Sequence, residues 1–207
     1  MTASNQMKTT NIGLLIGFAC LAIGFWVLVS FSWGSLALLV GGIVAWAIAF
    51  KGQSKIVLGR PYKLWWAIIA VIAYFAVGII VDTLAGLSGL HWVENPAVGH
   101  LGSLFVILPF MLMGEELLGI GILEAARSKG LSIATSSILS AIIFSLMHVP
   151  TYWDHSLVST LLHVFLLQGV ARLIFNYVYF KTGRSIWGSW ITHLIVDYAA
   201  LSLAGLL

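Results

Sequence analysis

Five ionisable side chains in or at the ends of long apolar runs are the residues of this chain best suited to chemistry. Glu115 and Glu116 are adjacent in one run, His148 ends the next, and His193 and Asp197 share a later one. An ionisable group in hydrocarbon costs several kcal/mol, so such a residue indicates a function by default. Carboxylates and imidazoles exchange protons with water, so these side chains predict acid–base chemistry inside a membrane.

The spacing of these residues indicates how they could cooperate. His193 and Asp197 are four residues apart, so they share one helix face and the carboxylate can fix the tautomer of the imidazole. Glu115 and Glu116 point about 100° apart on a helix, so we expect one to face the site and the other to pair with a neighbour. The alternative is a purely structural ion pair with Arg172, which lies inside another apolar run.

The remaining histidines carry less information. His148 closes a predicted helix because Val149-Pro150 follow it, and by itself it would be interpreted as an interfacial residue. Four further histidines have no partner at helical spacing, and we interpret them as structural or interfacial: His91, His100, His155 and His163.

The composition predicts a membrane protein. Of the 207 residues, 60% are hydrophobic and 8% are charged, against about 25% charged in an average soluble protein. A soluble domain of this size could not cover its surface with so few polar groups, whereas lipid accepts an apolar exterior. The net charge of +3 comes without a basic cluster, which excludes nucleic acid as a partner. The single cysteine, Cys20, excludes a disulfide within the chain.

Seven apolar runs predict an all-α integral membrane protein, a bundle of about seven transmembrane helices. The ionisable residues place an intramembrane site in its C-terminal half. We expect one membrane domain, in which residues 1–100 hold the N-terminal helices and an interfacial loop and residues 101–207 hold the site. The predicted runs are Asn11–Val29, Leu36–Phe50, Leu64–Val81, Leu101–Leu123, Leu131–Met147, Leu157–Phe180 and Ile186–Leu206.

The basic residues predict the orientation. Nine of the ten Lys and Arg residues, all except Arg172, fall before the first run or in alternate loops, which indicates a cytoplasmic N-terminus and an outer C-terminus. The first run is interpreted as a retained helix, and Asp82–His100 as an interfacial loop. At 1.5 Å per residue, Glu115, Arg172 and His193 lie about 11–12 Å from the cytoplasmic ends of their runs. His148 lies about 25 Å along its own run, so that helix must tilt strongly or begin below the surface.

Three short motifs in this order resemble the CAAX protease and bacteriocin-processing family, also called CPBP or Abi. They are Glu115-Glu116, then Phe144 four residues before His148, then His193 four residues before Asp197. The stretch from Lys181 to Trp187 is also similar to the family's approach to its third motif. The resemblance covers about Leu101–Leu207, and it implies a membrane-embedded bundle of catalytic helices.

One departure from the family pattern concerns the first motif. The family has Glu-Glu-x-x-Phe-Arg-Gly, whereas here Gly119 stands at the phenylalanine position and Ile120 at the arginine position. We hypothesise that Arg172 supplies the missing positive charge to Glu116.

The resemblance implies an intramembrane endopeptidase of the CAAX prenyl protease type in the lipid bilayer, acting on a membrane-tethered or prenylated protein or peptide. Glu115 would be the general base on water, His148 would orient that water or bind a metal, and His193, held by Asp197, would stabilise the oxyanion. Two alternatives stay open: zinc on Glu115, His148 and His193, or no metal. We expect a multi-pass protein of the bacterial cytoplasmic membrane.

Other interpretations remain open. The loss of the motif arginine favours a catalytically inactive relative that acts in bacteriocin self-immunity or as a membrane scaffold. Intramembrane carboxylates and histidines also form proton relays in carriers, although no matching halves are present. An acyltransferase using a His-Asp pair ranks last, because no cysteine or serine stands at a suitable spacing from His193.

Overall fold

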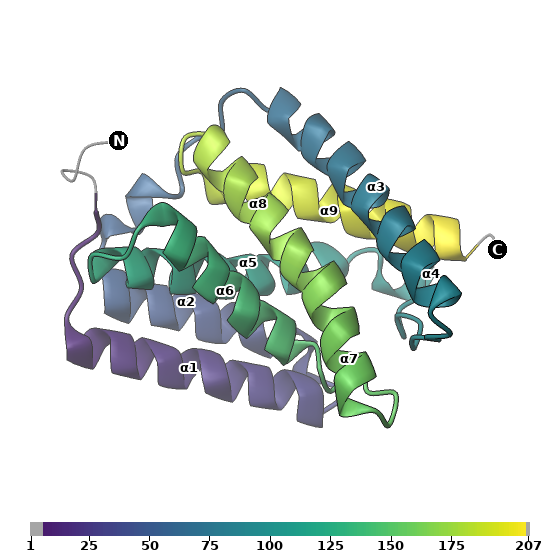
Figure 1. Cartoon of the computed structure of the whole chain (residues 1–207). Coiled ribbons are helices and arrows are strands. Elements are labelled where there is room, and N and C mark those ends of the chain that lie inside the picture. Colours follow the sequence, from purple (N-terminus) through teal and green to yellow (C-terminus); the bar gives the residue numbers. More distant parts are fainter. Residues whose placement is uncertain (1–5, 206–207) are drawn as a thin grey trace.

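The computed structural model describes residues 6–205, and within that range the protein is helical and contains no strand. A π-helical turn, Val164–Gly169, makes α7 and α8 one continuous rod, and short 3-10 turns lie at Gly34–Leu36 and Gln53–Ile56. The helices are α1 Asn11–Ser30, α2 Ala37–Phe50, α3 Trp65–Leu87, α4 Leu101–Leu104, α5 Leu108–Ser128, α6 Ile133–Met147, α7 Leu157–His163, α8 Val170–Lys181 and α9 Ile186–Ala204 (Figure 1).

Helices occupy all seven predicted runs, with corrections at two of them. Helix α3 continues past Val81 to Leu87, so the first six residues of the predicted interfacial loop Asp82–His100 are helical. The predicted run Leu101–Leu123 is not a single helix, because α4 ends at Leu104 and α5 begins anew at Leu108, with Pro109 in its first turn. Proline is tolerated there because it has no N–H to offer a preceding turn. At its other end α5 continues five residues past the predicted limit. Residues 1–5 and 206–207 lie outside the described range. They include Leu206, the last residue of the seventh predicted run, and the outer ends of the two predicted parts, 1–100 and 101–207.

The outward faces of these helices are apolar. Exposed Ile, Leu, Phe and Trp side chains cover α1, α3 and α6, for example Ile12, Ile68 and Ile138. Three helical stretches of the described residues are long and apolar enough to cross a bilayer: Asn11–Ser30, Trp65–Leu87 and Leu157–Lys181. Such faces are stable against lipid and would be unstable against water.

Glycines bring α1 and α2 into close contact. A Cβ built on Gly24 would lie 2.7 Å from the carbonyl oxygen of Ala37, and one on Gly41 would lie 2.6 Å from that of Cys20. Only glycine allows the two backbones to approach so closely. Membrane helices associate largely through packing of this kind, because lipid removes the hydrophobic drive between them.

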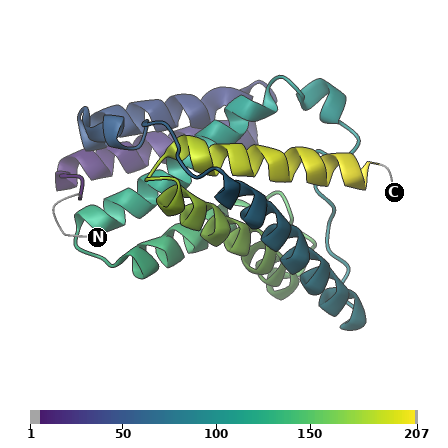
Figure 2. The same ribbon diagram turned by 90° about the horizontal axis from the view of Figure 1, so that it is seen from above.

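Helix α5 lies at the centre of the bundle and packs against α2, α6 and α9. The indole of Trp46 on α2 donates a 2.8 Å hydrogen bond to the carbonyl oxygen of Leu117, which fixes the contact between α2 and α5. Helices α3 and α8 run side by side and are inclined to α9 in both views (Figures 1 and 2). Helix α5, which carries the glutamate pair, thus lies between α2 of the N-terminal half and α6 and α9 of the C-terminal half.

Candidate active site

Glu116 is the centre of a buried polar cluster. Its carboxylate accepts two hydrogen bonds from the guanidinium of Arg172 on α8, at 2.8 and 3.1 Å. The hydroxyl of Ser189 on α9 donates to Oε2 at 2.5 Å, and Nδ1 of His193 lies 3.0 Å from Oε1. Glu116, Arg172 and Ser189 are fully buried and His193 is 5% exposed. Both oxygens of Glu116 are therefore engaged, and this carboxylate joins α5, α8 and α9.

Arg172 reaches Glu116 because α5 leaves room for it. A Cβ on Gly119 would lie 2.6 Å from Nη1 and 2.9 Å from Cδ of Arg172, so a side chain at this position would displace the arginine. Nε of Arg172 donates to Asn176 at 3.0 Å, and the guanidinium packs over the rings of Phe144 and Phe175 at 5.5 Å each. The hypothesised pairing of Arg172 with Glu116 is present.

Ile120 lies where the family pattern has its arginine, four residues after Glu116 on the same helix. Its side chain is fully buried in an apolar cluster with Trp46, Tyr179 and Ile186. The positive charge beside Glu116 therefore comes from α8 and not from the next turn of α5. The substitutions at positions 119 and 120 form one consistent set with Arg172, because the glycine opens the space that the arginine fills.

Glu115 and Asp197 lie on the other side of His193. Its Nε2 is 3.9 Å from Oε2 of Glu115 and 3.6 Å from Oδ1 of Asp197. Their side chains are 19% and 29% exposed, so this side of the cluster is accessible from outside the bundle. The expected division between the two glutamates is observed, since one is engaged internally and the other faces the open side. The shortest contact of His193, however, is with Glu116 and not with Asp197, which the four-residue spacing had indicated.

His148 ends α6 beside the same cluster. Its Nδ1 lies 2.8 Å from the carbonyl oxygen of Phe144, and its ring packs on that of Phe144 with centroids 4.7 Å apart. A carbonyl oxygen can only accept, so Nδ1 is the donor and Nε2 of the neutral ring retains its lone pair. Phe144 thus orients His148 and also lies 6.3 Å from the ring of His193. The second and third motifs meet through this phenylalanine.

Glu115, His148 and His193 are the three residues that the sequence offers as zinc ligands. Among residues 6–205, no group of three or more His, Cys, Asp or Glu side chains is arranged to hold a metal ion. Glu115, His148 and His193 therefore do not form a zinc donor set in this arrangement, and the mechanism below uses no metal.

A second buried network was not predicted from the sequence. Glu124 on α5 is fully buried, pairs with Arg184 at 2.7 Å, accepts from the Tyr179 hydroxyl at 2.7 Å and lies 3.5 Å from Arg127. Glu124 falls just beyond the predicted end of its apolar run, so it was not recognised as an intramembrane charge. This network fixes the C-terminal end of α5 against α8 and the start of α9. Ser189 and Asn176 were also missed, because uncharged polar residues are common in helices and give no signal.

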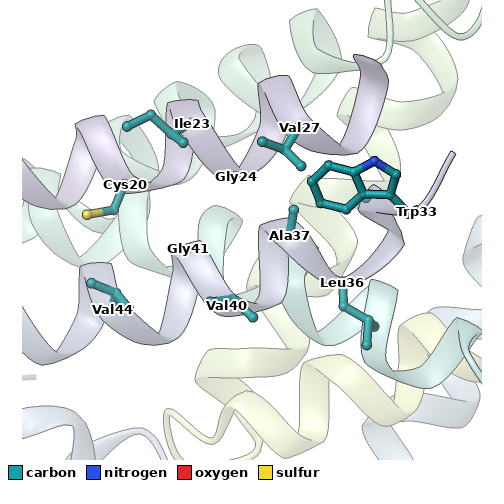
Figure 3. A pocket seen from close by; sticks show the side chains of 11 residues that line it. Cys20, Ile23, Gly24, Val27, Trp33, Leu36, Ala37, Val40, Gly41 and Val44 are labelled. Atoms are coloured by element: carbon teal, nitrogen blue, oxygen red, sulfur yellow. The ribbon is translucent and has the colours of Figure 1, made fainter. Parts of the chain in front are cut away.

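The hollows on the outer surface lie away from the cluster. One, of about 450 Å³, is lined by apolar residues of α1 and α2 such as Ile23, Val27 and Val40 (Figure 3). Another, of about 260 Å³, lies between α3 and α8 and includes Trp66 and Ile174. Neither contains a residue of the polar cluster, and both have the character of lipid-facing grooves.

The fold and the polar cluster define a helical integral membrane protein with acid–base side chains buried between α5, α6, α8 and α9. In comparison with known families, residues 97–199 match the family described as type II CAAX prenyl endopeptidase Rce1-like. The chain belongs to this family, which confirms the resemblance inferred from the three motifs. Neither the curated proteins nor the solved structures gave a match.

Proposed function

We propose that the protein is an intramembrane endopeptidase of the CAAX prenyl protease type, which hydrolyses a peptide bond in a membrane-associated protein or peptide. The observation that carries this proposal is that the two glutamates lie against different nitrogens of His193. The engaged Glu116 holds Nδ1, while the accessible Glu115 faces Nε2 at 3.9 Å. A carboxylate on the open side of an oriented imidazole is suited to activate water.

In the proposed mechanism, Glu115 accepts a proton from a water molecule as the water oxygen attacks the carbonyl carbon of the scissile bond. The lone pair on Nε2 of His148 accepts the other hydrogen of the water and so orients it. His193 carries a proton on both nitrogens, so Nδ1–H donates to Glu116 while Nε2–H donates to the oxygen that becomes negatively charged. Glu115 then returns the proton to the leaving amine, and the C–N bond breaks to give an acid and an amine.

Arg172 and Asp197 act as positioning residues in this proposal. The ion pair with Arg172 keeps Glu116 charged and in place, so that Glu116 holds Nδ1 of His193 in its donor form. Asp197, at 3.6 Å from Nε2, favours a proton on that nitrogen. We further propose seven membrane crossings with a cytoplasmic N-terminus, and a membrane-tethered or prenylated substrate that approaches the open side of the cluster.

The proposal is tested with purified protein in detergent or liposomes and a panel of membrane-tethered peptides, including farnesylated C-terminal ones. We expect wild type to cleave at least one peptide and Glu115→Gln to lose about 100-fold or more in kcat, because a general base typically contributes about 10²–10⁴-fold. Asp82→Asn, which likewise converts a carboxylate into an amide at an exposed position of α3, is the matched control. Cleavage that survives in folded Glu115→Gln would refute the assignment of the base.

Removal of metal ions distinguishes activation of water by Glu115 alone from activation of water by a bound metal ion. Activity is expected to be unchanged after dialysis against a strong chelator. Loss of activity that zinc restores would contradict the metal-free mechanism and would require the donor set to rearrange on binding. Wild type that folds, retains the Glu116–Arg172 pair and binds but never cleaves these peptides would favour the inactive, scaffold-like interpretation.

A further inference from the structure

A stack of aromatic side chains leads from the α3–α4 loop to the candidate site. Trp92 of this loop lies flat on His163 of α7, with ring centroids 4.8 Å apart and an interplanar angle of 3°. Tyr152 meets His163 edge-on at 4.5 Å and stacks on His148 at 6.2 Å. The stack therefore connects the loop to His148, which takes part in the proposed chemistry.

Two polar atoms in this stack have no partner. Nε1 of Trp92 and Nδ1 of His163 are buried, and within the described part of the chain neither has a hydrogen-bond partner. His163 as a whole is only 5% exposed. A buried donor without an acceptor costs about 1–3 kcal/mol, so two such atoms on adjacent rings indicate that a ligand group completes the arrangement.

The chemistry of the two atoms selects the ligand. The indole nitrogen is only a donor, and Nδ1 of His163 is a donor or an acceptor according to the tautomer. In an extended peptide the N–H donor and the carbonyl acceptor of one residue point to the same side, so the backbone satisfies the pair in either tautomer. A prenyl chain offers neither group, so the peptide part of a lipidated substrate is what fits.

The surrounding structure is suited to local opening. His163 is followed at once by the π-helical turn Val164–Gly169, a feature frequent at functional sites. Gly89 and Gly99 bracket Trp92 at φ +73° and +78°, and a Cβ on either would meet nothing within 4 Å. Glycines in the left-handed region at both ends of a loop allow it to swing with little steric cost.

Tyr152 links Trp92 and His163 electrostatically to the carboxylates of the candidate site. Burial raises the pKa of the Tyr152 phenol, the carboxylates of Asp197 and Glu115 raise it further, and a hydrogen bond with Asn95 opposes the shift. Asn95 belongs to the same loop as Trp92. The loop is therefore coupled through Tyr152 to the open side of the cluster, where the scissile bond would lie.

We propose that Trp92 and His163 form a subsite that hydrogen-bonds a peptide unit of the substrate, with the loop between Gly89 and Gly99 closing over it. This inference rests on the proposed peptidase function and extends it to substrate recognition. Trp92 and His163 bind the peptide next to the reacting bond, and they exchange no proton with it.

The test measures steady-state cleavage of a farnesylated peptide that ends in a free carboxylate, and it compares wild type with variants of the subsite. Trp92→Phe keeps an aromatic ring for stacking and removes the N–H together with part of the ring area, a loss that the control below shares. His163→Phe removes both nitrogens. We expect each to raise KM about two- to tenfold, the loss of one to two hydrogen bonds, with kcat within about threefold of wild type. His163→Asn, whose amide nitrogen lies near the position of Nδ1, is expected to recover most of the affinity.

Trp153→Phe in the neighbouring loop is the matched control, because Trp153 is 43% exposed. If wild type cleaves and Trp92→Phe has the KM of the control, the subsite is refuted while the proposed function stands. If no protein cleaves the peptide, its binding to Trp92→Phe and to the control is measured directly. Weaker binding by Trp92→Phe than by the control supports the subsite although the peptidase function fails. Equal binding overturns it. A fall in thermal stability with unchanged KM and unchanged binding would also overturn it, because it would make the stack purely structural.

Discussion

Removal of Arg172 tests the central feature of the site, a buried carboxylate whose positive partner comes from another helix. In Arg172→Leu, Glu116 loses two hydrogen bonds of 2.8 and 3.1 Å in a place where both side chains are fully buried. Breaking a buried pair by removing one partner costs about 3–5 kcal/mol, because the remaining charge is uncompensated. This corresponds to a roughly 100- to 4,000-fold change in the unfolding equilibrium constant.

The assay is equilibrium unfolding in mixed micelles, followed by circular dichroism. Removing the charge of the partner as well should relieve part of the loss, so Glu116→Gln/Arg172→Leu is expected to be more stable than Arg172→Leu alone. The coupling energy should be about 0.5–3 kcal/mol. Arg60→Leu, at an exposed loop arginine, is the control and should change stability by less than about 0.5 kcal/mol.

A second arm restores the family's arrangement. Ile120→Arg places an arginine one turn after Glu116, but the side chain at position 120 is fully buried among apolar groups. In combination with Arg172→Leu it should therefore recover none of the lost stability. If Arg172→Leu unfolds like wild type and retains its activity, the role of this pair is refuted. If the two single changes are simply additive in Glu116→Gln/Arg172→Leu, the contact carries no coupling and the electrostatic argument fails.

Two further predictions concern packing and the second buried network. Gly119→Ala places a Cβ 2.6 Å from Nη1 of an arginine that Glu116 holds in place, so it should lower stability by about 1–3 kcal/mol. Gly78→Ala, the same change on α3 with nothing within 4 Å, should be neutral or stabilising by up to about 1 kcal/mol, and equal effects of the two changes would contradict the packing argument. Tyr179→Phe removes a 2.7 Å hydrogen bond to the buried Glu124 and should cost about 1.5–3 kcal/mol in the same unfolding assay. Tyr177→Phe, at a ring that is 48% exposed, is its control, and a loss no larger than in the control would show that the hydroxyl contributes nothing.

The all-α class and the approximate helix positions could be predicted from the sequence, because apolar length and periodicity depend only on local residues. The pairing of Arg172 with Glu116 could also be predicted, since a single arginine inside an apolar run needs a partner. The extension of α5 to Ser128 could not, because Glu124 and Arg127 look like the end of a membrane segment until Arg184 and Tyr179 are known to lie against them.

The contacts of His193 show where prediction from spacing ends. Four-residue spacing correctly brought Asp197 near the imidazole, but at 3.6 Å, while Glu116 on α5 lies at 3.0 Å. The choice between them depends on how α9 is rotated against α5, which no pattern within one helix encodes. The depth of His148 likewise disagreed with that of Glu115, Arg172 and His193 because depth was counted along separate helices. In the structure α6 is inclined to α9, so residues at different distances along their helices still meet (Figure 1).

The ion pair of Glu116 and Arg172 also has a consequence for the order in which the protein is made. The two residues are 56 positions apart, and Ser189 and His193 follow 73 and 77 positions after Glu116. At about 5–20 residues per second, the ribosome needs about 3–11 s to produce the arginine after the glutamate. During that interval α5 carries a carboxyl group with no partner, so it must stay in contact with water or with the insertion machinery. The final position of α5 in the bilayer is therefore decided only when the last third of the chain arrives.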